Sequence, residues 1–353
     1  MKTMSRGVVV TFMLFSVLSV SAQVVGNLDY FEGDVQISRG DRVFDAWDFG
    51  FGESLSQGEV VETGANGNAE FSFVDRVGAS VIIRSNTAYT VSLRDGDAGG
   101  ETEARVDLLF GRVRVVTDGL RENRSLNVRS GAVVAGVRGT EFDVMTSPDG
   151  AVLVGTRSGV VATRTERGEQ LVRPGTVVEV LSSGVMSSVS IPVERMDDYF
   201  DIWLDLRTQA FSANPVLFIQ PYLERFDRLY GSFVSSANRL LPFRERLEEA
   251  AFRPDLQASD AVNLRTQTAT AVVGARGSLA QFEETYFTLA QLVGLMSDSD
   301  KAALSASHRR LLDRFQRERN NALRAVADTR YILGLYDMMD FDILPGGTRR
   351  QGL

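Results

Sequence analysis

The sequence predicts an α+β protein with an all-β N-terminal half and a C-terminal half of long helices. Two patterns predict it. From about residue 28 to residue 181, short runs rich in β-formers recur at intervals of about ten residues, each bounded by glycine or asparagine. After Pro192, apolar residues follow the alternating three- and four-residue spacing of helices that pack on one another.

The first 22 residues have the three features of a secretory signal peptide. Lys2 and Arg6 provide positive charge, residues 8–20 form an uncharged and mostly apolar run, and small residues end at Ala22. We therefore expect cleavage after Ala22 and export to the periplasm or beyond. Retention as an uncleaved anchor is the alternative, although the run is shorter than the roughly 20 residues that span a bilayer.

Composition narrows the chemistry. The chain has no cysteine, which excludes disulfides, thiolate metal sites and a cysteine nucleophile. Its formal net charge of −8 makes nucleic acid and anionic lipid poor partners.

With 353 residues, about two domains are expected. We assign residues 23–191 to the β domain and 192–340 to the helical domain, with 341–353 as a flexible tail.

One stretch of the β half combines glycines with a short alternating strand. In residues 135–144, Gly136 and Gly139 are expected to form a sharp turn, because glycine adopts backbone angles that other residues avoid. The strand that follows places Phe142 and Val144 on one face, and Glu141 and Asp143 on the other. We expect the apolar pair to point into the core. The backbone amides at the two glycines, beside Arg138, are a weaker candidate for binding an anion.

This order of motifs resembles the FecR domain of Gram-negative envelopes. The similar segments are Gly-Glu-Val-Val-Glu-Thr-Gly at 58–64, Asn-Ala-Glu-Phe-Ser-Phe at 68–73, Arg-Ser-Asn-Thr at 84–87, Leu-Phe-Gly-Arg-Val-Arg-Val at 109–115, Val-Arg-Gly-Thr-Glu-Phe-Asp-Val at 137–144, and Arg-Pro-Gly-Thr-Val-Val at 173–178. The resemblance implies an all-β, twisted solenoid or sandwich, with Gly136, Gly139, Thr140, Phe142 and Val144 as its structural motif.

The resemblance also limits the function. The sigma-regulating members carry a cytoplasmic anti-sigma segment and a transmembrane helix before this domain, whereas here we expect only the signal peptide. What transfers is an interaction module on the envelope side. Within the motif, Arg138 and Glu141 are the two residues we expect to be exposed and to contact a partner.

The helical half is expected to form an antiparallel bundle. Helices are predicted over about 193–213, over 219–251 with a kink at Pro242, over 259–296, and from about 300 to 339. The last two, joined at residues 297–300, predict a coiled-coil-like hairpin about 60 Å long. The bundle offers a surface for self-association.

The candidate catalytic and metal-binding groups are few. The only histidine, His308, can complete a serine–histidine–carboxylate triad in principle, but a packing role fits its heptad position better. Asp197, Asp201 and Asp205 share one helix face, where acidic residues at a helix start also suit the helix dipole. The acidic loop at 95–101 lacks the ligand spacing of a calcium site. We expect no catalytic residue, no metal and no cofactor.

Three functions remain open. The first is a non-enzymatic envelope protein that binds an envelope protein or a cell-wall component through the β domain. The second is a signalling component that relays an external state to a separate membrane regulator. The third is an envelope hydrolase with an unrecognised site. Such a hydrolase would have to rely on carboxylate groups for catalysis.

Overall fold

The computed structural model describes residues 24–39, 42–74, 77–94, 102–117, 124–131, 133–137, 139–253 and 256–339. The expected signal peptide, the acidic loop at 95–101, Arg138 and the expected tail at 341–353 lie outside these residues. Among the described residues, no helix combines the length and the apolar character needed to cross a membrane.

The described β-strands form two nine-stranded sheets. Sheet A contains, in spatial order, β18 (Met186–Ser190), β17 (Thr176–Val180), β14 (Val152–Ser158), β13 (Glu141–Thr146), β10 (Arg112–Thr117), β7 (Ala79–Ile83), β6 (Asn68–Phe73), β1 (Val24–Glu32) and β4 (Glu53–Ser56). Sheet B contains β16 (Gly168–Val172), β15 (Val161–Thr165), β12 (Val133–Val137), β11 (Arg124–Ser130), β9 (Thr102–Phe110), β8 (Thr87–Arg94), β5 (Val60–Thr63), β2 (Val35–Arg39) and β3 (Arg42–Asp45).

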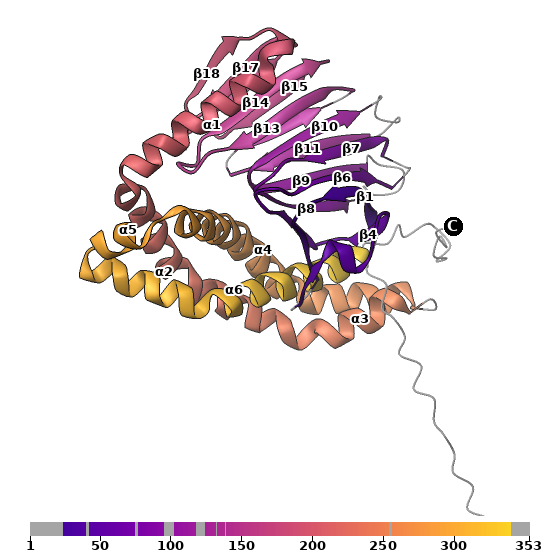
Figure 1. Cartoon of the computed structure of the whole chain (residues 1–353). Helices are drawn as coiled ribbons and strands as arrows, with labels where there is room; N and C mark the ends of the chain where they lie inside the picture. Colours follow the sequence, from indigo (N-terminus) through magenta and orange to yellow (C-terminus); the bar gives the residue numbers. More distant parts are fainter. Residues whose placement is uncertain are drawn as a thin grey trace, which may run out of the picture.

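The two sheets make one elongated sandwich along which the chain advances from end to end. The chain crosses repeatedly between the sheets, so the first four strands lie at one end and β16 to β18 at the other (Figure 1). Every pair is antiparallel except β9 with β11, which is parallel. The inward-facing residues of both sheets form one core, with Phe31, Phe71, Tyr89 and Phe142 fully buried. The α+β fold class, with its sandwich of solenoid-like progression, is confirmed.

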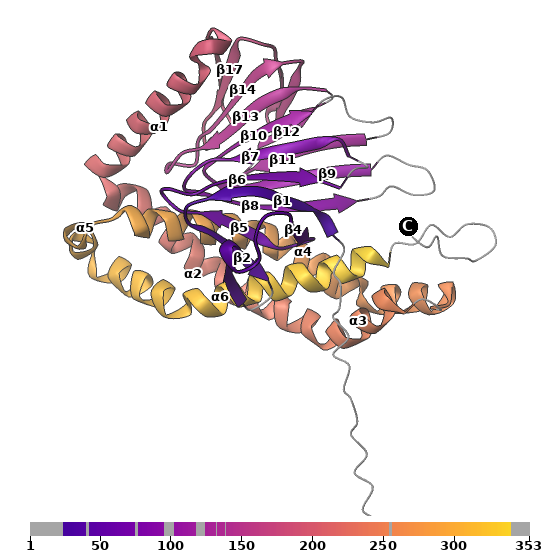
Figure 2. The same cartoon turned by 45° about the vertical axis from the view of Figure 1, so that its right-hand side comes forward.

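The helices follow the sandwich in the chain. They are α1 (Met196–Ala213), α2 (Pro215–Leu240), α3 (Arg244–Phe252), α4 (Ala258–Leu295), α5 (Asp298–Ala303) and α6 (Ala306–Met338). Helix α1 lies along sheet A near β14 and β17, whereas α2, α4 and α6 form a separate layer (Figure 2). That layer packs on sheet B, where Val60, Leu109 and Phe110 join the core of the helices. The chain's own helices thus cover parts of both outer faces.

The helical layer differs from the expected hairpin in two respects. Helices α4 and α6 contact each other, but α2 packs against both and is the central helix. The last expected helix is divided, because α5 ends at Ala303 and Ser305 caps the start of α6 by accepting a hydrogen bond from His308 N. The expected turn is present, with a capping box between Ser297 and Asp300. At Pro242 the helix is interrupted by the 3₁₀ turn η4 (Leu241–Phe243).

The N-terminal end of the sandwich carries the 3₁₀ turn η1 (Ala46–Asp48) and charged groups that join β2 to β4 and to the residue before β5. The Arg39 guanidinium lies 2.5 Å from the Glu53 carboxylate and 2.9 Å from that of Glu59. Burial raises the pKa of Glu59 to about 7, against the opposing effect of Arg39. Glu59 therefore holds a proton in the folded chain at a pH where the unfolded chain has released it.

This shift predicts a stability that depends on pH. Between about pH 4.5 and 7 the folded state binds more protons at Glu59 than the unfolded state does, so the free energy of unfolding falls as pH rises. The stabilisation is complete below pH 4.5 and is lost as pH rises through 7, with an upper limit of about 3 kcal/mol. Urea unfolding of the wild type and of Glu59→Gln at pH 4, 5.5 and 7.5 tests it. In the variant, the free energy of unfolding is expected to depend less on pH between about 4.5 and 7. The variant is also expected to be more stable than the wild type at pH 7.5. Parallel pH profiles for the two proteins contradict the assignment.

Candidate functional site

The stretch at residues 135–144 connects a strand of sheet B to a strand of sheet A. Gly139 lies between the strands with φ of +69°, as expected for a tight turn. The expectation for Gly136 needs correction, because it lies inside β12 and pairs with Asn127 and Ala162. A Cβ there would lie 2.8 Å from Asn127 Oδ1, so close packing rather than a turn explains the glycine. Thr140 is buried, and its N–H donates to Thr117 Oγ1 at 2.6 Å.

Strand β13 points Phe142 and Val144 inward and its acidic residues outward. Phe142 and Val144 lie in the sandwich core, at 0% and 1% exposure. On the opposite face, Asp143 is also fully buried. Burying a carboxylate requires compensating charges and hydrogen bonds. The partners of Asp143 therefore identify the polar centre of this face.

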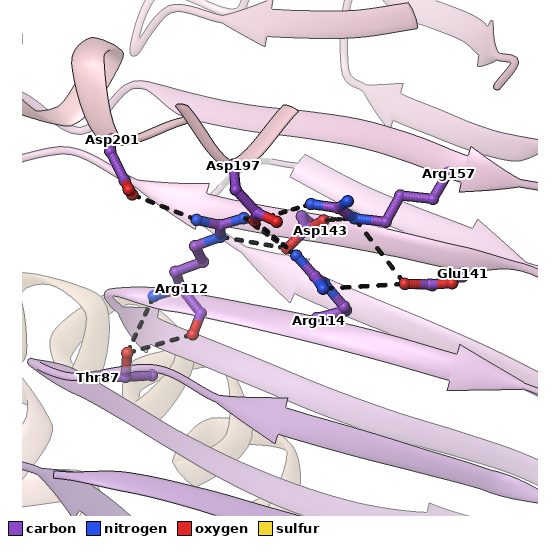
Figure 3. A network of polar contacts seen from close by, with 8 residues as sticks. All are labelled: Thr87, Arg112, Arg114, Glu141, Asp143, Arg157, Asp197 and Asp201. Carbon is purple, nitrogen blue, oxygen red and sulfur yellow. Dashed lines mark hydrogen bonds and ion pairs between the residues drawn. The ribbon is translucent and has the colours of Figure 1, made fainter. Parts of the chain in front are cut away.

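Three arginines converge on Asp143 (Figure 3). Arg112 Nη2 and Arg114 Nε donate to Oδ1 at 3.0 and 3.1 Å, and Arg157 Nε donates to Oδ2 at 2.8 Å. The arginines come from β10 and β14, the two neighbours of β13 in sheet A. Both carboxylate oxygens are thus satisfied by charge-assisted hydrogen bonds.

Helix α1 completes the cluster with a second carboxylate. Asp197 Oδ1 accepts from Arg112, from Arg114 at 2.6 Å and from Arg157 at 2.8 Å. We call these five residues, Arg112, Arg114, Arg157, Asp143 and Asp197, the arginine–aspartate cluster. It is the main polar attachment of α1 to the sandwich. One turn further along α1, Asp201 adds a 3.4 Å contact to Arg112.

The cluster favours the charged forms of Asp197 and Arg157. Burial acts to raise the pKa of Asp197, but the charges and hydrogen bonds of the three arginines outweigh it, and the pKa is lowered. Burial likewise acts to lower the pKa of Arg157, and Asp143, Asp197 and Glu141 outweigh it, so that pKa is raised. Asp197 and Arg157 are therefore held in their charged forms by their partners in the cluster.

Apolar packing holds α1 beside the cluster. Met196, Phe200 and Trp203 are buried against Met145, Leu153 and Val177 of sheet A. The Arg112 guanidinium lies 4.5 Å from the ring centroid of Phe200. Gly155 permits this approach, because a Cβ there would lie 2.9 Å from the same ring. At the next turns, Trp203 Nε1 donates to Glu179 at 2.7 Å, and Arg207 pairs with Glu179 and Asp149.

A cleft of about 750 Å³ adjoins the cluster. It lies between α1, the end of α4 and three turns of the sandwich. Its walls include Arg84, Asn86, Arg112 and Asp201, with Phe110 among the apolar residues. Asn86 has φ of +51°, the only non-glycine residue with positive φ among those described. The Arg-Ser-Asn-Thr turn quoted above thus forms part of the wall.

The two expected contact residues have different outcomes. Glu141 lies at the rim of the cluster with 36% of its side chain exposed, 3.9 Å from Arg114 and Arg157. Arg138 lies outside the described residues. Glu141 is thus reachable from solvent, and its role in binding stays a prediction.

Asp205 is exposed on α1, and the other candidates make structural contacts. Asp197 and Asp201 pair with arginines, and the described residues contain no group of three or more potential metal ligands. His308 Nε2 lies 3.0 Å from Glu224, and Nδ1 lies 2.9 Å from Ser305 Oγ. These three residues have the composition of a triad, but Ser305 Oγ already accepts from His308 N as the cap of α6. A capping hydroxyl bonded in this way is poorly placed to attack a substrate.

The fold and the cluster together define an α+β protein in which a long β-sandwich has a strap-like helix on one sheet and a helical layer on the other. Residues 59–162, from β5 to β15, match the family model described as FecR protein. The FecR resemblance drawn from the sequence is confirmed over this segment, which is less than half of the chain. The match includes Asp143 and the three arginines but neither the first four strands nor the helices.

Among solved structures, two crystal structures of a protein described as an anti-sigma factor from Parabacteroides distasonis ATCC 8503 are similar, at 1.65 and 2.50 Å resolution. Each has 15% sequence identity and a TM-score of 0.34, and the match covers 40% of this chain. It spans 64% and 63% of the length of those chains, which is less than two thirds. No curated protein matches this sequence.

The sequence contains a signal for part of the cluster. In residues 112–116, Arg112 and Arg114 alternate with valines that fill the core, so both arginines must face outward. Asp143 alternates in the same way with Phe142 and Val144. Pairing the two strands places these groups side by side, but only the position of α1 shows that they are buried.

Proposed function

We propose that this protein is a non-enzymatic component of the cell envelope that binds another envelope component through its FecR domain. In this proposal the chain is exported after cleavage at Ala22, residues 23–191 form the interaction module, and residues 192–340 position it or bring copies together. Glu141 and Arg138 are the proposed contacts within the family motif. The partner is an envelope protein or a cell-wall component.

The saturated arginine–aspartate cluster carries this proposal. A carboxylate that serves as a nucleophile or a general base has to reach a substrate. Asp143 is fully buried, and Asp197 is held ionised by three guanidinium groups. The main concentration of charge therefore fastens α1 to sheet A. A rigid, helix-braced sandwich suits recognition, because little conformational freedom is lost when it binds.

Site-directed photo-crosslinking in the native cell tests the proposal. A photo-crosslinking amino acid is introduced in place of Glu141 in one strain and in place of Asp205, an exposed residue on α1, in another. We expect one recurring envelope component to be attached at position 141 and not at position 205. If position 141 repeatedly yields no adduct, or the same adducts as position 205, the proposed contact face is wrong.

The FecR match over residues 59–162 also favours a second function, that of a signalling component. In that function, the bound state of the module is passed to a separate membrane regulator. Deletion of the gene is then expected to change transcription of a small set of genes, and a chain carrying Asp143→Ala is expected to behave like the deletion. Unchanged transcription under envelope stress argues for the binding role alone.

A hydrolase is the third function, and Ser305, His308 and Glu224 are the residues on which it would depend. Purified protein is incubated with peptidoglycan fragments, beside His308→Ala and Ser305→Ala variants. We expect no cleavage by any of the three proteins. Cleavage by the wild type that both variants lose would overturn the non-enzymatic proposal.

A further inference from the structure

Three exposed aromatic rings lie in a row at the N-terminal end of the sandwich. Tyr30 belongs to β1, Trp47 to η1, and Phe51 to the segment between η1 and β4. Their residues are 44%, 55% and 60% exposed. Phe51 is central, with ring centroids 5.6 Å from Tyr30 in a stacked arrangement and 6.0 Å from Trp47. We call these three residues the aromatic patch. A contiguous apolar surface of this kind marks an interaction site more often than single exposed rings do.

The patch is held on a rigid base. The buried ring of Phe31 lies beneath it, 4.8 Å from Trp47 and 5.0 Å from Phe51. Trp47 Nε1 donates to Gly33 O at 2.9 Å, and Trp47 N donates to Asp45 Oδ1 at 3.0 Å. The rings are thus ordered before anything binds, which lowers the entropic cost of recognition.

Exposed carboxylates surround the patch. Glu32 accepts a hydrogen bond from the Tyr30 hydroxyl at 3.2 Å, Glu70 is the cross-strand neighbour of Tyr30, and Asp48 follows Trp47 in the chain. Within the part of the chain that the structure describes, no arginine or lysine pairs with these three carboxylates. The hydrogen bond to Glu32, followed by the charges of Glu32 and Glu70, raises the pKa of Tyr30. The surface therefore has a negative potential.

The chain itself contains an example of what such a surface binds. The Arg39 guanidinium lies 4.6 Å from the ring centroid of Phe49 and forms a salt bridge with Glu53. The site of Arg39 thus combines an aromatic face with a carboxylate, an arrangement that attracts guanidinium and ammonium groups. Residues 24–58 have seven carboxylates and only two arginines, so the negative charge of this end exceeds what the chain neutralises.

From these observations we propose that the aromatic patch binds an arginine- or lysine-rich segment of a partner polypeptide. The inference rests on the proposed function, to which it adds the chemistry of the partner. The cationic groups lie over the rings and pair with Glu32, Glu70 and Asp48. The patch precedes residue 59, so it is a feature of this chain outside the matched FecR segment.

The test is a binding measurement with two synthetic peptides. One is a fluorescein-labelled octapeptide that alternates arginine and alanine, and the other has glutamate in place of each arginine. Fluorescence anisotropy of each peptide is followed on titration with the purified protein at 20 and 300 mM salt. We expect the arginine peptide alone to bind, and salt to weaken the binding, since screening acts on exposed charges.

Two variants and a matched control assign the binding to the patch. Trp47→Ala with Phe51→Ser is expected to weaken it about tenfold, because two cation–ring contacts are removed. Glu32→Gln with Glu70→Gln leaves the rings and is expected to weaken it several-fold and to reduce the effect of salt. The control is Ile202→Ser, which changes a residue on α1, away from the patch, that is 57% exposed. This variant is expected to bind the arginine peptide like the wild type. If Trp47→Ala with Phe51→Ser fails to fold, Glu32→Gln with Glu70→Gln still tests the proposal.

Several outcomes overturn the proposal. Equal affinity of the wild type and both patch variants excludes the patch, and binding of the glutamate peptide excludes a cationic partner. Sedimentation that shows a dimer lost in Phe51→Ser assigns the patch to a second copy of this chain instead. If position 141 crosslinks to an envelope component but neither peptide binds, the inference fails and the proposed function stands. If the arginine peptide binds but no envelope component is captured, the proposed function fails.

Discussion

Replacement of Asp143 with alanine is expected to lower the free energy of unfolding by about 3–5 kcal/mol. Three guanidinium groups then lose their buried partner, and an unpaired buried charge is strongly destabilising. Arg112, Arg114 and Arg157 are between 7% and 12% exposed, so water compensates little. Urea unfolding followed by circular dichroism measures the effect.

The matched control for this prediction is Asp201→Ala. Asp201 is 73% exposed and makes a single 3.4 Å contact with Arg112, so its loss is expected to change the free energy of unfolding by less than about 1 kcal/mol. Asp197→Ala is expected to lie between the two and to increase proteolytic cleavage within α1. Equal unfolding midpoints for Asp143→Ala and Asp201→Ala would show that the cluster is not a buried network.

The second large effect is expected at the contact between the helical layer and sheet B. Arg330 of α6 pairs with Glu283 of α4, with side-chain exposures of 9% and 10%, and its Nη1 donates to Thr90 Oγ1 of β8 at 2.5 Å. Arg330→Met is expected to cost about 3–5 kcal/mol, because Glu283 remains buried without its cation. The same unfolding measurement tests this loss.

Acid and a second substitution provide the controls for Arg330→Met. Burial already raises the pKa of Glu283, and without Arg330 this carboxyl takes up a proton at still higher pH. The defect is therefore expected to shrink as pH falls, since the penalty belongs to the charged form. Arg330→Met combined with Glu283→Leu is expected to recover most of the stability. A defect of equal size at every pH, unchanged in the double variant, contradicts the buried ion pair.

Local pattern determined the elements because their signals lie within a few residues of one another. The alternation in β13 places Phe142 and Val144 in the core, and the expected helix at 259–296 differs from α4 by one residue at each end. Caps such as Ser297 are likewise local. The same local reasoning failed at Gly136, which lies within β12 and where a Cβ would lie 2.8 Å from the Asn127 side chain of the neighbouring strand. A glycine needed for packing and a glycine needed for a turn look alike in one sequence.

The arginine–aspartate cluster required information that the sequence does not contain locally. Its members are spread from residue 112 to residue 197, and the alternation of β10 and β13 shows only that Arg112, Arg114 and Asp143 face outward. Whether an outward residue meets water or a helix depends on where α1 comes to lie. The same holds for Glu283 and Arg330, which come together only because α4 and α6 pack on sheet B.

By itself, the sequence determined the order of sandwich and helices, the FecR resemblance within the β half and the inward face of the central strand. These follow from residue type, spacing and local backbone preference. Only the tertiary structure decided that α1 and the helical layer cover the two sheets, that Asp143 is buried among arginines, and that Tyr30, Trp47 and Phe51 meet at one exposed end. Such contacts join residues far apart in the chain, and their burial and charge arise only once the layers have packed together.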